Sequence, residues 1–295
     1  MAGSSRGTFD IVVVGSANLD LVATVDALPQ PGQTVSAVSY AEHAGGKGLN
    51  QAVACARMGA TVAFIGCVGD DAAGHSLRAL LESEGVDVSG LRMSALPTGR
   101  ALITVDAAGE NSIVVVPGAN ATVGVGHDIV IPQCGLVLAQ LEIPLGTVAA
   151  VMTRARSMGA WTVLNPAPAV SLPADVIAAC DVIVPNETEE TVLGGAENLL
   201  ALGSGAVVLT LGARGARVMT AGSTTDIPAY PVTPVDTVGA GDAFVGAMCA
   251  KLVRSAPLED ACRVAAVAGA LATTVRGAVP GLPSLEKVLR AQAEG

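Results

Sequence analysis

Short apolar runs recur along the chain, and glycines or polar side chains follow each of them directly. The first run, Phe9 to Gly15, reads F-D-I-V-V-V-G and is typical of a buried, parallel strand. We expect further strands at 61–66, 136–140, 161–164, 181–185 and 206–211, and a short antiparallel extension at 217–230. Helical patterns lie at 70–85 and 144–158, and others begin at Ala243, Leu258 and Ser284. This alternation predicts an α/β fold with a doubly wound, mostly parallel sheet flanked by helices.

The residues that follow these runs should line one shared cleft, because the carboxyl ends of parallel strands meet at one edge of a sheet. They are Asn18, Asp20, Glu142, Asn165, the segment 186–189 and the segment 212–215. The turn after the first strand, G-S-A-N-L-D, is not G-x-G-x-x-G. A dinucleotide-dependent dehydrogenase is therefore disfavoured.

Composition restricts the class of protein further. Hydrophobic residues make up 51% of the chain and charged residues 14%, which favours a large core over disorder. A net charge of −10 and 2% aromatic residues argue against nucleic-acid binding. No apolar run reaches the roughly 20 residues that span a bilayer, and the polar segment 1–8 does not resemble a signal peptide. The six cysteines form no C-x-x-C pair and indicate buried thiols in the cytoplasm.

Two hairpin patterns lie outside the strand–helix alternation. The segment 21–41 carries Pro29, Pro31 and Gly32, and the segments 100–106 and 111–116 are joined by A-A-G-E. Together they predict a small β-sheet that forms a lid over the cleft, from about residues 19–42 and 99–117. We expect one domain over residues 1–295. The exposed edges of such a lid also predict a homodimer formed through it.

The segment 233–244, T-P-V-D-T-V-G-A-G-D-A-F, combines a glycine-rich turn with the start of an apolar helix. Free N–H groups and the helix dipole at such a turn favour an anion, most naturally a phosphate. A carboxylate at Asp242 would repel that phosphate, unless it takes a proton from a hydroxyl that attacks it. The alternative is a helix N-cap at Asp242 after an ordinary turn.

A second glycine-rich segment, A-G-G-K-G-L-N-Q-A at 44–52, also opens a helix. It is not a Walker A loop, because Lys47 is followed by glycine and the glycine spacing differs. Lys47 and Asn50 could instead offer a charge and an amide to hydroxyl groups. The alternative is a structural turn with a solvated lysine.

Three motifs in this order resemble the ribokinase family of carbohydrate kinases. They are G-G-K-G-L-N-Q-A-V-A at 45–54, P-N-E-T-E at 185–189 and D-T-V-G-A-G-D at 236–242. The likeness extends from Ile11 to about Pro283. It implies that Asp242 is the catalytic base, and that Gly239, Ala240 and Gly241 form the anion hole.

The resemblance also implies the ligand-binding residues. The sugar positions are Asn18, Asp20, Gly46, Lys47, Asn50, Glu142 and Asp242. The nucleotide positions are Asn186, Glu189, Thr210, Gly212, Ala213, Arg214, Gly215 and Gly241. Near the adenine pocket the family has a polar side chain where this chain has Ala265 and Ala266.

Two cations are implied as well, Mg²⁺ bound with ATP and K⁺ as an activator. The potassium positions are Asp236, Val238, Ala272, Val275, Gly277 and Gly281. Gly281 stands where the family has a serine ligand, so one ligand is missing here.

The implied reaction is ATP-dependent phosphorylation of D-ribose at O5, giving D-ribose 5-phosphate. Other kinases of the family act on deoxyribose, fructose, nucleosides or sugar phosphates. A phosphosugar site should bring several basic residues, and a nucleoside site should bring aromatic ones. Lys47 is the one obvious cation, and Tyr40 is the one aromatic residue in the hairpin segments. These observations favour a small neutral sugar without separating ribose from other pentoses. A non-catalytic sensor of sugar or nucleotide on the same fold is the alternative of another class.

Overall fold

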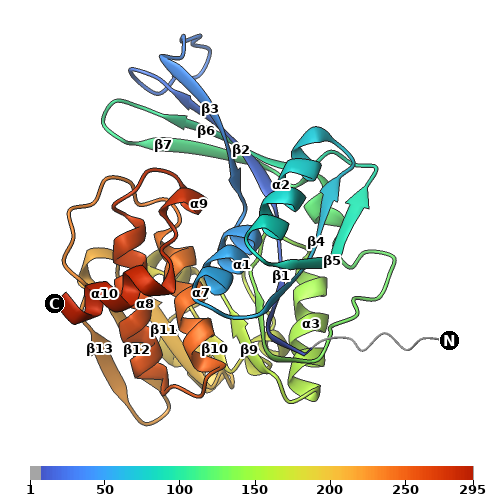
Figure 1. Cartoon of the computed structure of the whole chain (residues 1–295), viewed down its shortest axis with the longest axis vertical. Helices are drawn as coiled ribbons and strands as arrows, with labels where there is room; N and C mark the ends of the chain where they lie inside the picture. Colours follow the sequence, from blue (N-terminus) through green and yellow to red (C-terminus); the bar gives the residue numbers. More distant parts are fainter. Residues whose placement is uncertain (1–7, 295) are drawn as a thin grey trace.

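The computed structural model describes residues 8–294, and its body is built on a nine-stranded sheet (Figure 1). The order across this sheet is β13-β12-β11-β10-β9-β8-β1-β4-β5. The strands are β1 (Phe9–Val14), β4 (Val62–Gly69), β5 (Asp87–Ser94), β8 (Cys134–Ala139), β9 (Trp161–Leu164), β10 (Val182–Ile183), β11 (Ala206–Thr210), β12 (Ala216–Thr220) and β13 (Thr224–Ile227). All neighbours from β11 to β5 pair in parallel, whereas β12 and β13 pair antiparallel. The predicted α/β fold is confirmed.

Helices cover both faces of the sheet, because successive side chains of a strand point to opposite faces. In β1, Ile11 and Val13 belong to one hydrophobic core, and Val12 and Val14 belong to the other. The first core includes residues of α1 (Lys47–Arg57), α2 (Ala72–Ser83), α7 (Ala240–Leu252), α8 (Leu258–Ala272) and α10 (Leu285–Glu294). The second includes residues of α3 (Leu145–Ser157), α4 (Ala174–Ala178) and α6 (Ala196–Ala201). A strand buried on both faces explains the continuous apolar run at 9–15.

The order of the strands reverses beside β1. From β1 the chain moves outward through β4 and β5, then returns to β8 on the other side and continues through β9, β10 and β11. In open α/β sheets the ligand crevice lies at the carboxyl ends of the strands where this reversal occurs. The segments that follow β1 and β8 are therefore expected to meet in one site.

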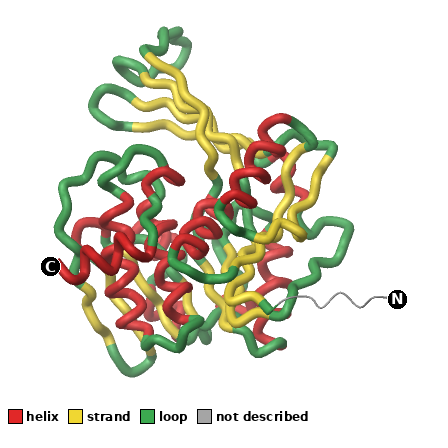
Figure 2. The backbone as a smooth tube through the Cα atoms, viewed as in Figure 1, coloured by secondary structure: helices red, strands yellow, loops and turns green. Residues whose placement is uncertain are grey.

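A separate four-stranded sheet, here called the lid, stands out from the body beyond α1 (Figures 1 and 2). Its order is β3-β2-β6-β7, with strands β2 (Asn18–Thr24), β3 (Ser39–Gly45), β6 (Gly99–Val105) and β7 (Asn111–Val116). The predicted hairpins are present, but β2 begins earlier and β3 ends later than the segment 21–41. Both strands therefore run directly into the cleft, where α1 begins two residues after β3.

One strand and four short helices were not predicted from the sequence. The segment of β5, D-V-S-G-L-R-M-S, has no continuous apolar run, because an edge strand keeps several of its side chains in water. The helices α4, α5 (Glu187–Val192) and α6 are each five or six residues long, too short for a clear helical pattern. The remaining helix, α9 (Ala278–Gly281), has four residues and contacts β3.

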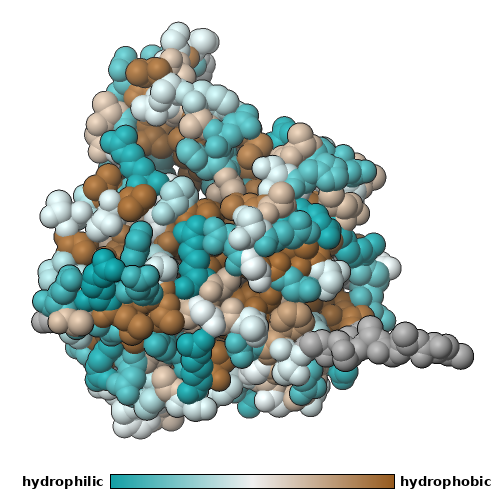
Figure 3. Space-filling view, viewed as in Figure 1, coloured by the Kyte–Doolittle hydropathy of each residue, from teal (hydrophilic) through white to brown (hydrophobic). Residues whose placement is uncertain are grey.

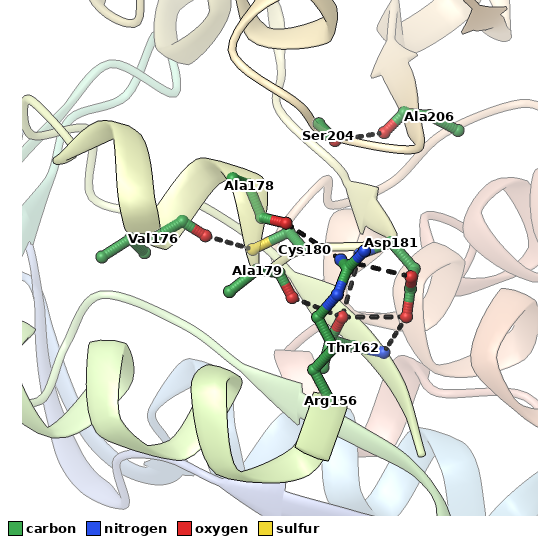
Figure 4. Close-up of polar contacts among 9 residues, drawn as sticks. All are labelled: Arg156, Thr162, Val176, Ala178, Ala179, Cys180, Asp181, Ser204 and Ala206. Atoms are coloured by element: carbon green, nitrogen blue, oxygen red, sulfur yellow. Dashed lines mark hydrogen bonds and ion pairs between the residues drawn. The ribbon is translucent and has the colours of Figure 1, made fainter. Parts of the chain in front are cut away.

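A polar cluster joins β9 and β10 at the amino ends of these strands, whereas the cleft lies at the carboxyl ends (Figure 4). Asp181 Oδ2 accepts hydrogen bonds from the backbone N–H and the hydroxyl of Thr162, each at 2.9 Å. Arg156 on α3 lies 3.7 Å from the same carboxylate and donates to the Ala178 carbonyl. These contacts are structural, since they lie at the amino ends of the parallel strands.

Three sequence expectations concern the location of the protein in the cell. The polar segment 1–8 was expected not to be a signal peptide, and residues 1–7 lie outside the described residues. No helix within residues 8–294 combines the length and the hydropathy that a bilayer crossing requires. The six cysteines are free thiols, and all but Cys134 are buried.

Candidate functional site

The carboxylate of Glu142 joins three segments of the cleft at the point where the strand order reverses. Glu142 follows β8, and its Oε2 accepts hydrogen bonds from the Ser16 hydroxyl at 2.5 Å and from the Lys47 backbone N–H at 3.1 Å. The side-chain amide of Asn18 lies 3.5 Å from the same oxygen. One carboxylate thus fixes the turn after β1, the start of the lid and the start of α1 relative to each other.

Asn120, which the sequence did not indicate, holds the first lid strand in place. Its Nδ2 donates to Asn18 Oδ1 at 2.7 Å, and its Oδ1 accepts from the Ala17 backbone N–H at 3.0 Å. Asn120 is buried in the short 3₁₀ helix η1 (Gly118–Thr122), close behind the lid strand β7. The lid is therefore attached to the cleft at both of its ends.

Glycines let main chain and side chains approach closely around this point. A Cβ on Gly45 would lie 2.1 Å from Asp20 Oδ2, so the carboxylate of Asp20 lies directly over the Gly45 backbone. A Cβ on Gly48 would lie 2.5 Å from the Ser16 backbone nitrogen. Gly46 has φ 90, in the left-handed region that favours glycine. The glycine-rich segment thus brings α1 against the end of β1.

The charged side chains of the cleft alter one another's protonation. Burial, with the nearby carboxylates of Glu142 and Asp242, raises the pKa of Asp20 to about 7. Burial disfavours the charged form of Lys47, but Asp242, Glu142 and Glu189 outweigh it, and the net pKa of Lys47 is raised. Lys47 therefore stays protonated among carboxylates from three other elements, and it is not a solvated surface lysine.

Asp242 is buried, with 8% of its surface exposed, and a different amide holds each of its oxygens. Asn50 donates from Nδ2 to Oδ2 at 2.9 Å, and Gln51 donates from Nε2 to Oδ1 at 2.9 Å. Both partners belong to α1, whereas Asp242 lies in the first turn of α7. The two glycine-rich segments of the sequence therefore meet through these hydrogen bonds.

Several backbone N–H groups at the start of α7 have no hydrogen-bond partner in the part of the chain that the structure describes. Gly239, with φ 80, precedes the helix as its N-cap, and no side chain caps it. Within residues 8–294, the backbone N–H groups of Gly239, Gly241 and Asp242 have no hydrogen-bond partner, and that of Ala240 donates to the Thr237 carbonyl at 3.3 Å. Asp242 is the third residue of α7, so the alternative of Asp242 as N-cap is wrong. Unpaired N–H groups and the dipole of a 13-residue helix favour an anion here.

The motif P-N-E-T-E forms the start of α5. Asn186 Oδ1 accepts from the Glu189 backbone N–H at 2.8 Å, and Glu189 Oε2 accepts from the Asn186 backbone N–H at 2.9 Å. This reciprocal pair is a capping box, which accounts structurally for the N-x-x-E spacing. Burial raises the pKa of Glu189; the Asn186 N–H and Lys47 oppose this rise, and Asp242 adds to it. Glu189 thus belongs to the same electrostatic cluster as Lys47 and Asp242.

The predicted nucleotide segment follows β11 on the same edge of the sheet. The backbone N–H of Thr210 donates to the Pro185 carbonyl at 2.9 Å, which joins this segment to the start of α5. Gly212, Ala213 and Arg214 form one 3₁₀ turn, and Gly215 follows with φ 92. Ala265 is fully buried in the core and Ala266 packs against it, so neither offers a polar group to a ligand.

The six positions predicted for a monovalent cation come from the segment before α7 and from the segment 272–281, and Asp236 joins the two. The carboxylate of Asp236 accepts from the backbone N–H of Val238 at 3.0 Å and from that of Gly277 at 2.8 Å. A Cβ on Gly281 would lie 2.8 Å from the Ala272 carbonyl oxygen and 3.4 Å from that of Val275. Two carbonyl oxygens therefore face Gly281, while both oxygens of Asp236 accept backbone N–H groups.

Of three buried amides of the site, Asn165 was expected to line the cleft, whereas Gln51 and Gln140 were given no role from the sequence. Gln51 lies inside a motif, and Gln140 and Asn165 come directly after β8 and β9. The rule that polar residues after strands line the cleft identified Asn165 and could have identified Gln140 as well.

The comparisons with known proteins agree with this geometry. A family model described as pfkB family carbohydrate kinase matches residues 8–285. A ribokinase of Staphylococcus aureus is 37% identical, over 95% of this chain and 99% of its own length. A deoxyribokinase of Salmonella typhi is 34% identical, over 94% of this chain and 97% of its own. The structure of an Arabidopsis thaliana ribokinase complexed with ribose and ATP matches with a TM-score of 0.88 at 30% identity, covering 97% of this chain and 99% of that one. The chain belongs to the pfkB family of carbohydrate kinases.

Proposed function

We propose that this protein is an ATP-dependent ribokinase, which transfers the γ-phosphoryl group of ATP to O5 of D-ribose. One observation carries the proposal: the first turn of α7 combines free N–H groups with the buried carboxylate of Asp242. Asp242 takes the proton of the attacking hydroxyl, while the N–H groups of Gly239, Ala240 and Gly241 stabilise the oxygens of the transferring phosphate. The names of the similar ribokinases support the choice of substrate.

The sugar would bind between the lid and α1. Asn50 Oδ1 is buried without a hydrogen-bond partner in the described part of the chain, and a sugar hydroxyl would satisfy it. Asp20, Lys47, Glu142 and Asn18 supply further acceptors and donors, and the backbone of Gly46 allows close approach. Several fixed polar partners are what a sugar of this size needs.

The nucleotide would bind along the ends of β10 and β11. Glu189 and Asn186 face the phosphates with their Mg²⁺, and the turn from Thr210 to Gly215 borders the nucleoside. The Arabidopsis ribokinase structure contains ATP, and Mg²⁺ is the usual companion of ATP in phosphoryl transfer. Potassium would bind beside the anion hole, through Asp236 and the backbone carbonyls of Val238, Ala272, Val275 and Gly277. With glycine at 281, we expect this site to lack one ligand.

Turnover measured across a panel of acceptors tests the proposal. ADP release from ATP and Mg²⁺ would be followed with ribose, deoxyribose, fructose, adenosine and fructose 6-phosphate, each with and without K⁺. We expect the highest kcat/KM with ribose, and an increase with K⁺. A preference for deoxyribose would move the substrate and keep the mechanism. Ribose or ATP binding without turnover on any sugar would contradict it in favour of a sensor.

Ribose binding should depend on the protonation of Asp20. Its pKa is raised to about 7, so the carboxyl is mainly ionised above pH 7 and mainly protonated below it. An ionised Asp20 accepts hydrogen bonds from hydroxyls, so we expect the affinity for ribose to fall as the pH drops through about 7. A single titrating group limits this fall to about tenfold per pH unit. Calorimetric titration with ribose between pH 5.5 and 8.5 measures it.

The variant Asp20→Asn provides the control for this titration. His43 lies directly opposite Asp20 on β3, and the variant leaves it unchanged. Asparagine keeps the shape of Asp20 and cannot ionise, so the affinity should be weaker and nearly constant with pH. A wild-type affinity that does not change with pH would contradict the role of Asp20.

We also propose a homodimer formed through the lid, in a cytoplasmic protein with one domain. The edge strand β7 exposes Ile113, Val114, Val115 and Val116, each between 45% and 58%. In the space-filling view the projecting lid carries apolar as well as polar side chains (Figure 3). Exposed apolar edge strands tend to pair with another chain. The free cysteines support a reducing compartment.

Sedimentation at micromolar concentration tests the dimer, and we expect twice the mass of the chain. Ile113→Lys and Val114→Lys place a charge on opposite faces of β7, since neighbouring residues of a strand alternate. The variant on the paired face should give a monomer, and the other should stay dimeric. A wild-type monomer would contradict the proposal.

A further inference from the structure

A chain of buried side-chain amides lies behind Asp242, on the side away from Asn50. Gln51 Nε2 donates to both Asp242 Oδ1 and Asn165 Oδ1, each at 2.9 Å. Gln51 Oε1 accepts from Gln140 Nε2 at 2.6 Å. Gln51 and Gln140 are 0% exposed, and Asn165 is 9% exposed. This chain of hydrogen-bonded amides connects α1 and α7 to the ends of β8 and β9, and all of its members are buried.

The direction of these hydrogen bonds is set by a main-chain group. The carbonyl of Val184 can only accept, and Asn165 Nδ2 donates to it at 2.9 Å. Asn165 must therefore turn its oxygen toward Gln51, and Gln51 must turn its NH₂ group toward Asn165 and Asp242. The oxygen of Gln51 then points the other way, where Gln140 donates to it. Since a backbone carbonyl cannot flip, the amide of Gln51 presents a donor to Asp242 and not an acceptor.

The orientation of Gln140 leaves one of its buried polar atoms unpaired among the described residues, which costs free energy. Its Oε1 is buried and has no hydrogen-bond partner within residues 8–294. A flipped Gln140 would set its oxygen against the oxygen of Gln51, so the unpaired acceptor accompanies the required donor. Gly15 leaves room for this amide, because a Cβ there would lie 2.2 Å from Gln140 Oε1. A buried, unpaired polar group calls for an explanation beyond packing.

We infer that Gln51 is a positioning residue for the base, and that Gln140 and Asn165 fix the direction of its hydrogen bond. This inference rests on the proposed function, in which Asp242 accepts the proton of the sugar hydroxyl. One amide on each oxygen fixes the plane of the Asp242 carboxylate. Asn50 borders the sugar, whereas Gln51 reaches only Asp242 and the buried amides. Without Gln51 the carboxylate can rotate away from the attacking hydroxyl, which lowers turnover and leaves sugar binding intact.

A double-mutant cycle with Gln51→Met and Asp242→Asn tests the inference. Methionine fills a similar volume and cannot donate. We expect Gln51→Met to lower kcat about tenfold, with KM for ribose and ATP changed less than about threefold. In the Asp242→Asn background the same change should lower kcat hardly at all, because the base has already been removed. An equal loss in both backgrounds would overturn the positioning role. Near-normal turnover of Asp242→Asn alone would instead overturn the base itself.

A second pair of variants tests the direction of the chain without changing Gln51. Gln140→Glu keeps the shape of glutamine. Burial raises the pKa of such a carboxyl, and its protonated form can still donate to Gln51. Its ionised form, at high pH, replaces the donor by an acceptor, so Gln51 is drawn to turn its NH₂ group away from Asp242. Gln140→Met removes the donor without imposing that turn. At high pH we expect kcat to fall further in Gln140→Glu than in Gln140→Met, with ribose affinity by calorimetry near that of the wild type. If kcat instead fell further in Gln140→Met than in Gln140→Glu, the shape of the side chain and not the direction of its hydrogen bond would matter. That result would contradict the inference.

Discussion

Replacing Asp242 by asparagine should lower kcat about 10²-fold or more, because the side chain keeps its shape and loses the ability to take a proton. Asp242 is buried, and its two oxygens are held by Asn50 and Gln51. Asparagine has one acceptor oxygen, so it can keep at most one of these two hydrogen bonds. Because its shape is nearly unchanged, we expect KM for ribose to change by a small factor while kcat collapses. Steady-state ADP release and calorimetric ribose binding separate the two quantities.

The variant Asp181→Asn is the control for this substitution. Asp181 is a partly buried carboxylate that accepts two hydrogen bonds (Figure 4), and it lies at the amino ends of the parallel strands, away from the cleft. Its loss should lower the melting temperature and leave kcat near the wild-type value. If Asp242→Asn turned over ribose as fast as Asp181→Asn, the assignment of the base would be wrong.

Replacing Gly48 by alanine should cost both stability and activity. The new Cβ would lie 2.5 Å from the Ser16 nitrogen and 2.7 Å from the Ser16 oxygen, and main-chain atoms of this kind have no flexible end that can move aside. The helix α1 must shift away from β1, and it carries Lys47 and Asn50 with it. Overpacking of this kind costs about 1–3 kcal/mol. A shift of about 1 Å in a site can lower activity about 10²-fold.

Gly146 provides a matched comparison, because it is the second residue of α3 as Gly48 is the second residue of α1. A Cβ on Gly146 meets no atom within 4 Å. Gly146→Ala should therefore raise the free energy of unfolding by about 0.4–1 kcal/mol, through helix propensity and the loss of unfolded-state entropy. Urea unfolding and kcat/KM of both variants decide the matter. Similar behaviour of the two alanines would show that close approach at Gly48 has no importance.

The body of the fold was open to prediction because its strands are buried on both faces. Such strands read as apolar runs, and the bounds of β9 agree with the predicted segment 161–164. The edge strand β5 escaped prediction for the opposite reason, since water covers part of it. The lid strands β2 and β3 were predicted too short. Their inner ends are continued by pairing, from Asn18 opposite Gly45, which no local pattern reveals.

The site was predictable where its residues lie in glycine-rich or strand-end segments. Asn50 and Asp242 lie in such segments, and the structure brings them into direct contact. Asn120 was missed because it lies in a short 3₁₀ turn, and its importance comes from contact with Asn18, 102 residues away. Which distant side chain completes a hydrogen bond depends on how elements pack. Sequence patterns report only where elements begin and end.

The two hydrogen bonds on Asp242 affect the order in which the protein folds during synthesis. They join residues 191 and 192 positions apart, so the carboxylate finds its partners only when the two ends of the chain have met. Contacts of such separation form late in folding, because the entropy of closing the intervening loop must be overcome first. A ribosome that has released α1 must still add almost two hundred residues before α7 emerges. The nascent protein can therefore acquire most of its sheet while it remains without catalytic capacity.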